Sequence, residues 1–147
     1  HFFNRYRADG KVKLFEASGS YADGEQIRDF VSVEDVVKVN LHFLDQSNLS
    51  GIFNLGTGRG QTYNDMALAT INACRVAKGE PKISLAEAKA KGMIEYLPFP
   101  PALKGKYQSY TQADMTALLT AGYPVPFLAV EEGVSRYVQE LLDARPA

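Results

Sequence analysis

Four short segments of this sequence carry the pattern Ser/Thr-x-x-Asp/Glu, in which a hydroxyl and a carboxylate satisfy the free amides at a helix start. The pairs are Ser32 with Asp35, Thr62 with Asp65, Ser84 with Glu87, and Thr111 with Asp114. Apolar residues recur at helical spacing after the first, second and fourth pairs, so three helices are predicted there. A separate amphipathic pattern predicts a fourth helix from about Val130.

Short segments that are apolar or rich in β-branched residues lie between these helical patterns. They predict strands at residues 12–15, 29–31, 52–55 and 94–97. Strand and helix therefore alternate along the chain. This alternation favours an α/β fold over an all-β fold or a helical bundle.

The composition limits the class of protein and its partners. The chain has 147 residues, of which 46% are hydrophobic, enough for one domain with a core. Its net charge of −1 predicts no general attraction to nucleic acid or to an anionic membrane surface, so any phosphate recognition must be local. Cys74 is the single cysteine, which excludes an internal disulfide and favours a reducing, cytoplasmic compartment. No apolar run approaches the roughly 20 residues needed to span a bilayer.

Arg28 comes next to the predicted strand 29–31 and shortly before the helix start at Ser32. Guanidinium donors and free helix amides can converge on phosphate oxygens, so this segment is a candidate anion site. The alternative is a surface ion pair between Arg28 and Asp29 or a solvated turn, and the residues alone do not decide between these and an anion site.

A glycine turn at Gly56 and Gly58 follows the predicted strand 52–55. A dinucleotide-binding fingerprint needs a third glycine where this chain has Gln61. The pattern therefore favours a tight structural turn over a phosphate-binding loop.

Two further segments are candidates for ligand contact. Lys104 and Lys106 precede Tyr107 in a cationic loop that could engage a diphosphate, although a solvated basic turn is the commoner arrangement. Phe15, at the end of a predicted strand and followed by residues 16–18, could face a nucleobase; the alternative is a place in the core.

Several residue patterns that active sites require are missing. His1 and His42 are the only histidines, so neither a zinc site nor a His-based triad is predicted. None of the eight tyrosines has a lysine four residues later. We therefore expect no catalytic residues and no metal ligands in this chain.

The motifs RDFVSVEDV at residues 28–36 and IFNLGTG at 52–58 resemble the carboxy-terminal half of extended short-chain dehydrogenase/reductases that act on nucleotide sugars. Within that superfamily, IEYLPFP at 94–100 and LKGKYQSYTQAD at 103–114 resemble the ADP-glyceromanno-heptose 6-epimerases. The resemblance extends over essentially the whole chain.

This resemblance implies a function. Such enzymes use NADP to invert C6 of the heptose in ADP-D-glycero-D-manno-heptose, giving the L-glycero product for the lipopolysaccharide inner core. It also implies substrate contacts and a cytoplasmic homopentamer, while the possible diphosphate contacts at Lys104 and Lys106 rest on their charge alone. The implied substrate contacts are His1, Phe15, Glu16, Ala17, Ser18, Arg28 and Tyr107.

The resemblance also implies an incomplete enzyme. The family's NADP loop, its Tyr-x-x-x-Lys pair and its second catalytic lysine belong before residue 1, so the whole chain, 1–147, is expected to be a substrate-binding portion without the Rossmann core. The start at His1, without Met or a helix cap, also suggests truncation. We expect residues 28–78 to pack onto the absent domain and the chain alone to be inactive. The alternatives are another nucleotide-sugar epimerase or dehydratase, or a non-catalytic nucleotide-binding module.

Overall fold

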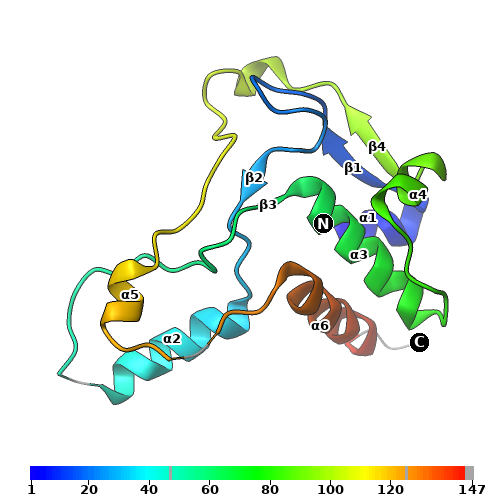
Figure 1. Ribbon diagram of the computed structural model, residues 1–147. Coiled ribbons are helices and arrows are strands. Elements are labelled where there is room, and N and C mark those ends of the chain that lie inside the picture. The colour runs from blue at the N-terminus through cyan, green and yellow to red at the C-terminus, as the bar shows by residue number, and fades with distance from the viewer. Residues whose placement is uncertain (47, 125, 145–147) are drawn as a thin grey trace.

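The computed structural model describes residues 1–46, 48–124 and 126–144, and Figure 1 shows their arrangement. The helices and strands in chain order are α1 (Phe2–Asp9), β1 (Val12–Phe15), β2 (Ile27–Arg28), α2 (Val33–Asp45), β3 (Gln61–Thr62), α3 (Tyr63–Ala77), α4 (Leu85–Ala90), β4 (Ile94–Leu97), a 3₁₀ turn (Pro101–Leu103), α5 (Thr116–Thr120) and α6 (Val130–Asp143).

The main core lies where β1 and β4 pair and helices pack around them (Figure 1). The two strands are parallel, with Val12 opposite Ile94 and Phe15 opposite Leu97. Val12 and Leu14 point to the buried side, while Lys13 and Phe15 point to the other face, as the two-residue period of a strand requires. Ile71 of α3 and Val138 of α6 complete this core.

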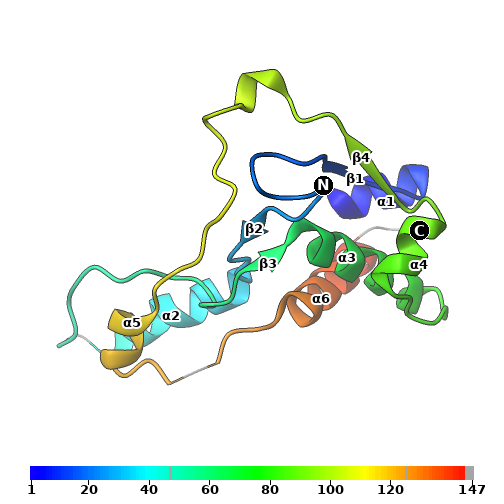
Figure 2. The ribbon, with the colours of Figure 1, turned by 45° about the horizontal axis from the view of Figure 1, so that its top comes forward.

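A smaller core joins α2 and α5, away from the main one (Figures 1 and 2). Its buried side chains include Val39, Met115, Leu118 and Tyr123. The short antiparallel pair of β2 and β3 lies between the two cores, with Ile27 opposite Thr62. Tyr110 forms a single parallel bridge with Ile27, which holds the segment between β4 and α5 beside β2.

Several sequence predictions are confirmed. The strands at 12–15 and 94–97 have the predicted bounds, and helices follow Ser32 and Thr62 and begin at Val130. Reciprocal capping boxes form at Thr62 with Asp65 and at Ser84 with Glu87, and the second precedes the short helix α4, which apolar spacing did not predict.

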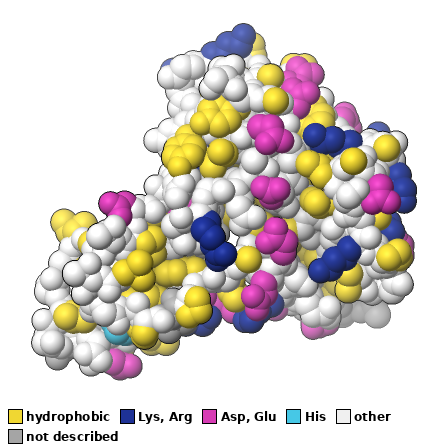
Figure 3. Space-filling model, in the orientation of Figure 1, with side chains coloured by type: hydrophobic (Ala, Val, Ile, Leu, Met, Phe, Trp, Pro, Cys, Tyr) yellow, Lys and Arg dark blue, Asp and Glu magenta, His cyan; other side chains and the backbone are white. Residues whose placement is uncertain are grey.

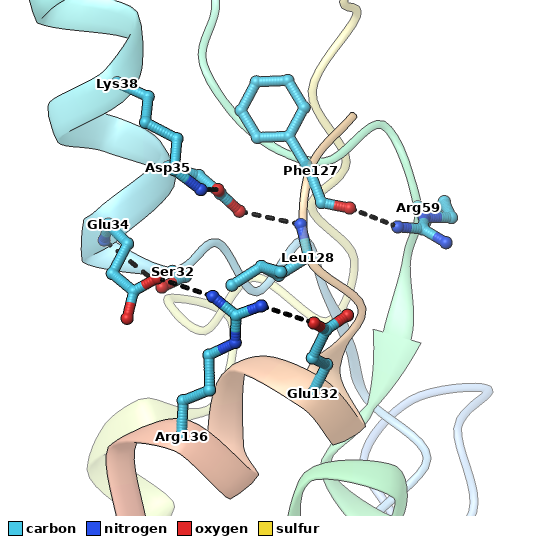
Figure 4. A network of polar contacts seen from close by, with 9 residues as sticks. All are labelled: Ser32, Glu34, Asp35, Lys38, Arg59, Phe127, Leu128, Glu132 and Arg136. Atoms are coloured by element: carbon cyan, nitrogen blue, oxygen red, sulfur yellow. Dashed lines mark hydrogen bonds and ion pairs between the residues drawn. The ribbon is translucent and has the colours of Figure 1, made fainter. Parts of the chain in front are cut away.

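Asp35 does not complete a capping box with Ser32. Ser32 accepts a hydrogen bond from the Glu34 amide at 3.3 Å, while the Asp35 side chain turns inward and is 1% exposed. Its carboxylate accepts hydrogen bonds from the Leu128 amide at 2.8 Å and from Lys38 at 2.9 Å (Figure 4). This residue therefore attaches the segment before α6 to α2.

Three predicted elements are wrong. The strand near Arg28 covers Ile27–Arg28 rather than 29–31, because its partner β3 offers only Gln61 and Thr62 for pairing. Residues 52–55 form no strand; no neighbouring strand pairs with them, and Ile52 is 99% exposed. The helix expected after Thr111 starts only at Thr116, whose amide donates to Asp114 at 2.9 Å.

Candidate ligand cavity

A cavity of about 450 Å³ opens between α1, the outer face of β1 and the end of the segment after β4. This volume suits a ligand of small-molecule size. The cavity is lined by His1, Phe2, Arg5, Lys13, Leu14, Phe15, Gln26, Tyr63, Leu97 and Tyr107. Of the predicted substrate contacts, the structure therefore brings together His1, Phe15 and Tyr107.

Phe15, Phe99 and Tyr107 form an aromatic cluster at this cavity. The Phe15 ring meets Phe99 edge-on with centroids 5.5 Å apart, and Tyr107 meets Phe99 in the same way at 5.4 Å. Phe15 is half-buried and lines the cavity, so it is not confined to the core. Edge-to-face packing of this kind restricts the rings and leaves a rigid apolar wall.

Tyr107 is held in its un-ionised form. Burial, together with a hydrogen bond to Tyr63, raises the pKa of Tyr107 to about 12, although the nearby Arg28 charge acts in the opposite direction. Its hydroxyl is therefore protonated throughout the physiological range. Tyr107 can offer both a ring face and a neutral hydroxyl to a ligand.

Arg28 contacts two residues of the cavity lining, Tyr63 and Tyr107, and is not itself one of the lining residues. Its guanidinium donates hydrogen bonds to the Ile27 carbonyl at 2.7 Å and to the Gln108 carbonyl. It also stands 4.9 Å from the centre of the Tyr107 ring and 5.9 Å from that of Tyr63. Arg28 thus joins β2 to the Tyr107 segment in this conformation.

The surface ion pair considered for Arg28 and Asp29 is not formed in the described part of the chain. Asp29 instead accepts hydrogen bonds from the amide and hydroxyl of Thr57 at 2.7 and 2.6 Å, from the Gly58 amide at 2.9 Å, and from the Ala113 amide at 3.1 Å. Burial opposes ionisation, but these hydrogen bonds outweigh it and lower the pKa of Asp29. Asp29 is a structural anion that the sequence did not single out.

The Asp29 carboxylate packs directly against Gly56. A Cβ at Gly56 would lie 2.5 Å from an Asp29 oxygen and 2.7 Å from the Ala113 Cβ. Glycine is required here by close approach of neighbouring atoms, as the structural interpretation of the turn predicted. The Thr57 and Gly58 amides, which a phosphate would need as donors, already donate to Asp29.

The remaining candidates lie outside the cavity lining. Glu16 and Ala17 are exposed, and the turn 16–18 is held by a hydrogen bond from the Ala17 amide to Asp23 at 2.7 Å. Lys104 and Lys106 are exposed on the segment before Tyr107. Neither lysine lines the cavity in this conformation.

Sequence reasoning missed Arg5, Lys13, Gln26 and Tyr63, all of which line the cavity. A signal was available for Lys13, which is two residues before Phe15 and so shares its strand face. No comparable signal marked Tyr63, because its approach to Tyr107 spans more than 40 residues. Arg5 lies on α1, a helix that was not predicted.

Within the described residues there is no group of three or more His, Cys, Asp or Glu side chains arranged to hold a metal ion. In the same residues, no helix is both long and apolar enough to cross a membrane.

The chain is also similar to known proteins. The NAD dependent epimerase/dehydratase family matches residues 1–56. An ADP-L-glycero-D-manno-heptose-6-epimerase of Thiobacillus denitrificans is 60% identical over 144 residues, which are 98% of this chain and 43% of that protein. The chain is similar to an ADP-heptose 6-epimerase. It spans less than half the length of that relative and matches its carboxy-terminal part.

Solved structures support the fold. A UDP-glucose 4-epimerase of Thermus thermophilus in complex with NAD matches 98% of this chain and 39% of its own, with a TM-score of 0.69 and 23% identity. A dTDP-glucose 4,6-dehydratase of Bacillus anthracis in complex with NAD matches 97% of this chain and 38% of its own, with a TM-score of 0.67 and 17% identity. The predicted α/β class and the resemblance to ADP-heptose 6-epimerases are confirmed.

Proposed function

We propose that this chain is the substrate-binding portion of an NADP-dependent epimerase that inverts C6 of ADP-D-glycero-D-manno-heptose to give the L-glycero epimer. The observation that carries the proposal is the 60% identity to the Thiobacillus denitrificans heptose epimerase over 98% of this chain. Such identity over nearly the whole chain favours a shared ligand class over a shared fold alone.

The cavity supports a nucleotide-sugar ligand. Phe15 and Tyr107 provide aromatic surface on one wall, and aromatic rings are suited to a nucleobase. His1 lines the same space, while Arg28 holds the Tyr107 segment in place. In this proposal Arg28 acts by positioning Tyr107, and it contacts the substrate only if that segment moves. Lys104 and Lys106, and residues 16–18, remain candidates for contact on the same condition.

The described residues do not fit an NADP site. The one glycine turn that resembles a dinucleotide loop is filled by Asp29, and no tyrosine of the chain has a lysine four residues on. We therefore assign NADP binding and hydride transfer to a preceding Rossmann domain. This chain's part is to bind and orient the ADP-sugar.

A face of α2 supports the presence of that domain. Val33, Val37, Leu41 and Leu44 are 49–75% exposed along one side of the helix, and Ile52 is 99% exposed in a segment with strand composition. Figure 3 shows hydrophobic side chains gathered over the α2 and α5 part of the molecule. We propose that residues 28–78 pack onto the Rossmann domain through this face. The assembled enzyme is then a cytoplasmic homo-oligomer, and its resemblance to the epimerase family implies a pentamer. Its product is used in lipopolysaccharide synthesis.

The test compares two proteins, the product of the complete gene and the 147-residue chain. Each is incubated with ADP-D-glycero-D-manno-heptose and NADP, and the two C6 epimers are separated by chromatography. We expect epimerisation by the complete protein and none by the chain.

UDP-glucose and dTDP-glucose serve as competing substrates in the same assay. Turnover of either of these by the complete protein, without turnover of the ADP-heptose, would reject the proposed substrate. Epimerisation by the chain alone would reject the assignment of all catalytic groups to another domain.

A further inference from the structure

The charged side chains that line the ligand cavity are all cationic. Arg5 from α1 and Lys13 from β1 reach this space, and no aspartate or glutamate is among its lining residues in the described chain. By contrast, among the described residues the cavity between α2 and α6 is lined by Glu34 and Glu140 and by no lysine or arginine. The ligand cavity therefore favours a negatively charged ligand, and the cavity between α2 and α6 does not.

Both cations are available to a ligand. The Arg5 side chain is exposed, and the structure shows no ion pair for it within the described residues. Lys13 faces Glu95 at 3.8 Å, near the limit for an ion pair, with 28% of its side chain exposed. A partly exposed pair at that separation is weak, so an incoming phosphate can replace Glu95 at little cost.

The position of these cations relative to the aromatic wall matches a nucleotide. Lys13 and Phe15 project from the same face of β1, two residues apart, which separates their Cα atoms by about 6.6 Å. A base against Phe15 would therefore leave phosphate groups within reach of Lys13, in a cavity that Arg5 also lines.

We propose that Arg5 and Lys13 form the phosphate-binding pair for the nucleotide diphosphate of the substrate. This inference rests on the proposed function and names residues that the sequence motifs did not. It replaces Lys104 and Lys106 as the main diphosphate contacts, because those lysines do not line the cavity. It also makes the ligand's phosphates, rather than its sugar, the group that α1 recognises.

The experiment measures binding of ADP and of adenosine to the 147-residue chain by calorimetry at two salt concentrations. The Arg5→Ala/Lys13→Ala double variant should bind ADP at least about tenfold more weakly, while adenosine affinity changes by less than about twofold. The salt dependence of ADP binding should also decrease, since fewer charged contacts remain.

The matched control is Lys82→Ala/Lys91→Ala, which removes two positive charges from exposed positions outside the cavity lining and should leave ADP affinity within about twofold. A variant with Arg5→Lys in place of Arg5→Ala, combined with Lys13→Ala, should bind ADP more tightly than the double alanine variant. Circular dichroism should show that every variant is folded. The proposal that Arg5 and Lys13 bind the phosphates would be overturned by any of three results. These are unchanged ADP affinity in the double alanine variant, an equal loss of affinity for adenosine, or no ADP binding by the unaltered chain.

These outcomes are separable from the proposed function. If UDP binds as tightly as ADP and with the same dependence on Arg5 and Lys13, the phosphate pair stands and the ADP-heptose assignment fails. If the complete protein epimerises ADP-heptose with an unchanged KM in the double variant, the phosphate pair alone is wrong.

Discussion

At the residue scale, the motif that includes Arg28 and Asp29 has a structural role that its charges did not reveal. Asp29 gathers four hydrogen bonds from Thr57, Gly58 and Ala113, which are 28 to 84 residues away along the chain. Arg28 meanwhile bonds to a carbonyl 80 residues away. The motif joins three separate segments, and ligand contact by Arg28 is not required to explain it.

Asp29→Ala should lower the free energy of unfolding by about 2 to 4 kcal/mol at neutral pH, because three backbone amides lose their acceptor. The pKa of Asp29 is lowered by folding, so the stability it contributes is present above the unfolded-state pKa. That contribution is lost as the pH falls through the lower, folded-state value. The difference between variant and parent should therefore shrink in strong acid.

Urea denaturation at pH 7 and at successively lower pH measures both effects. Asp9→Ala, at an exposed position on α1, is the control and should change stability by less than about 0.5 kcal/mol. Equal stability losses for the two variants would contradict the role assigned to Asp29.

At the element scale, helices with a strong local pattern were predicted and the strand at 52–55 was not found. A helix completes its hydrogen bonds within itself, and α2, α3 and α6 carry local apolar spacing, with side-chain caps at the starts of α2 and α3. A strand needs a partner, and none stands beside residues 52–55 in the described chain. The same dependence explains why β2 is displaced from its predicted bounds.

The attachment of α6 to α2 depends on one buried carboxylate in the network of Figure 4. Asp35→Ala should destabilise the chain by about 1 to 3 kcal/mol, because it leaves the partly buried Leu128 amide without an acceptor, while Lys38, whose side chain is 42% exposed, stays solvated. Thermal and urea unfolding of the variant would measure the loss.

Glu34→Ala is a close control, since it removes the neighbouring carboxylate from the same network. The Glu34 ion pair with Arg136, at 3.2 Å, is exposed on both sides, so its loss should cost less than about 1 kcal/mol. If the Glu34 variant were less stable than the Asp35 variant, the burial of Asp35 would not explain the attachment of α6 to α2.

At the scale of the whole molecule, the two cores differ in how fully they are covered. The core around β1 and β4 is surrounded by helices, whereas α2 carries apolar residues on both its buried and its exposed sides. A helix that is apolar on both sides is typical of a buried position. This is the physical basis for placing another domain against α2.

Replacing Val37 and Leu41 with lysine should reduce self-association of the 147-residue chain and change its free energy of unfolding by less than about 1 kcal/mol, because both side chains are about half exposed. Sedimentation velocity at several concentrations provides the measurement. Val76→Lys, at an exposed apolar position on α3 outside this face, should have a smaller effect. Equal effects of both changes would argue against a specific docking face.

The sequence by itself determined the α/β class, the positions of α2, α3, α6, β1 and β4, and the resemblance to nucleotide-sugar epimerases, because capping, periodicity and motifs are local properties of the chain. Only the tertiary structure decided that Arg5, Lys13 and Tyr63 share a cavity with Phe15 and Tyr107. It also decided that Asp29 fills the Gly56 turn and that residues 52–55 lack a partner strand. Those outcomes depend on contacts between residues far apart in the sequence, which no local pattern specifies.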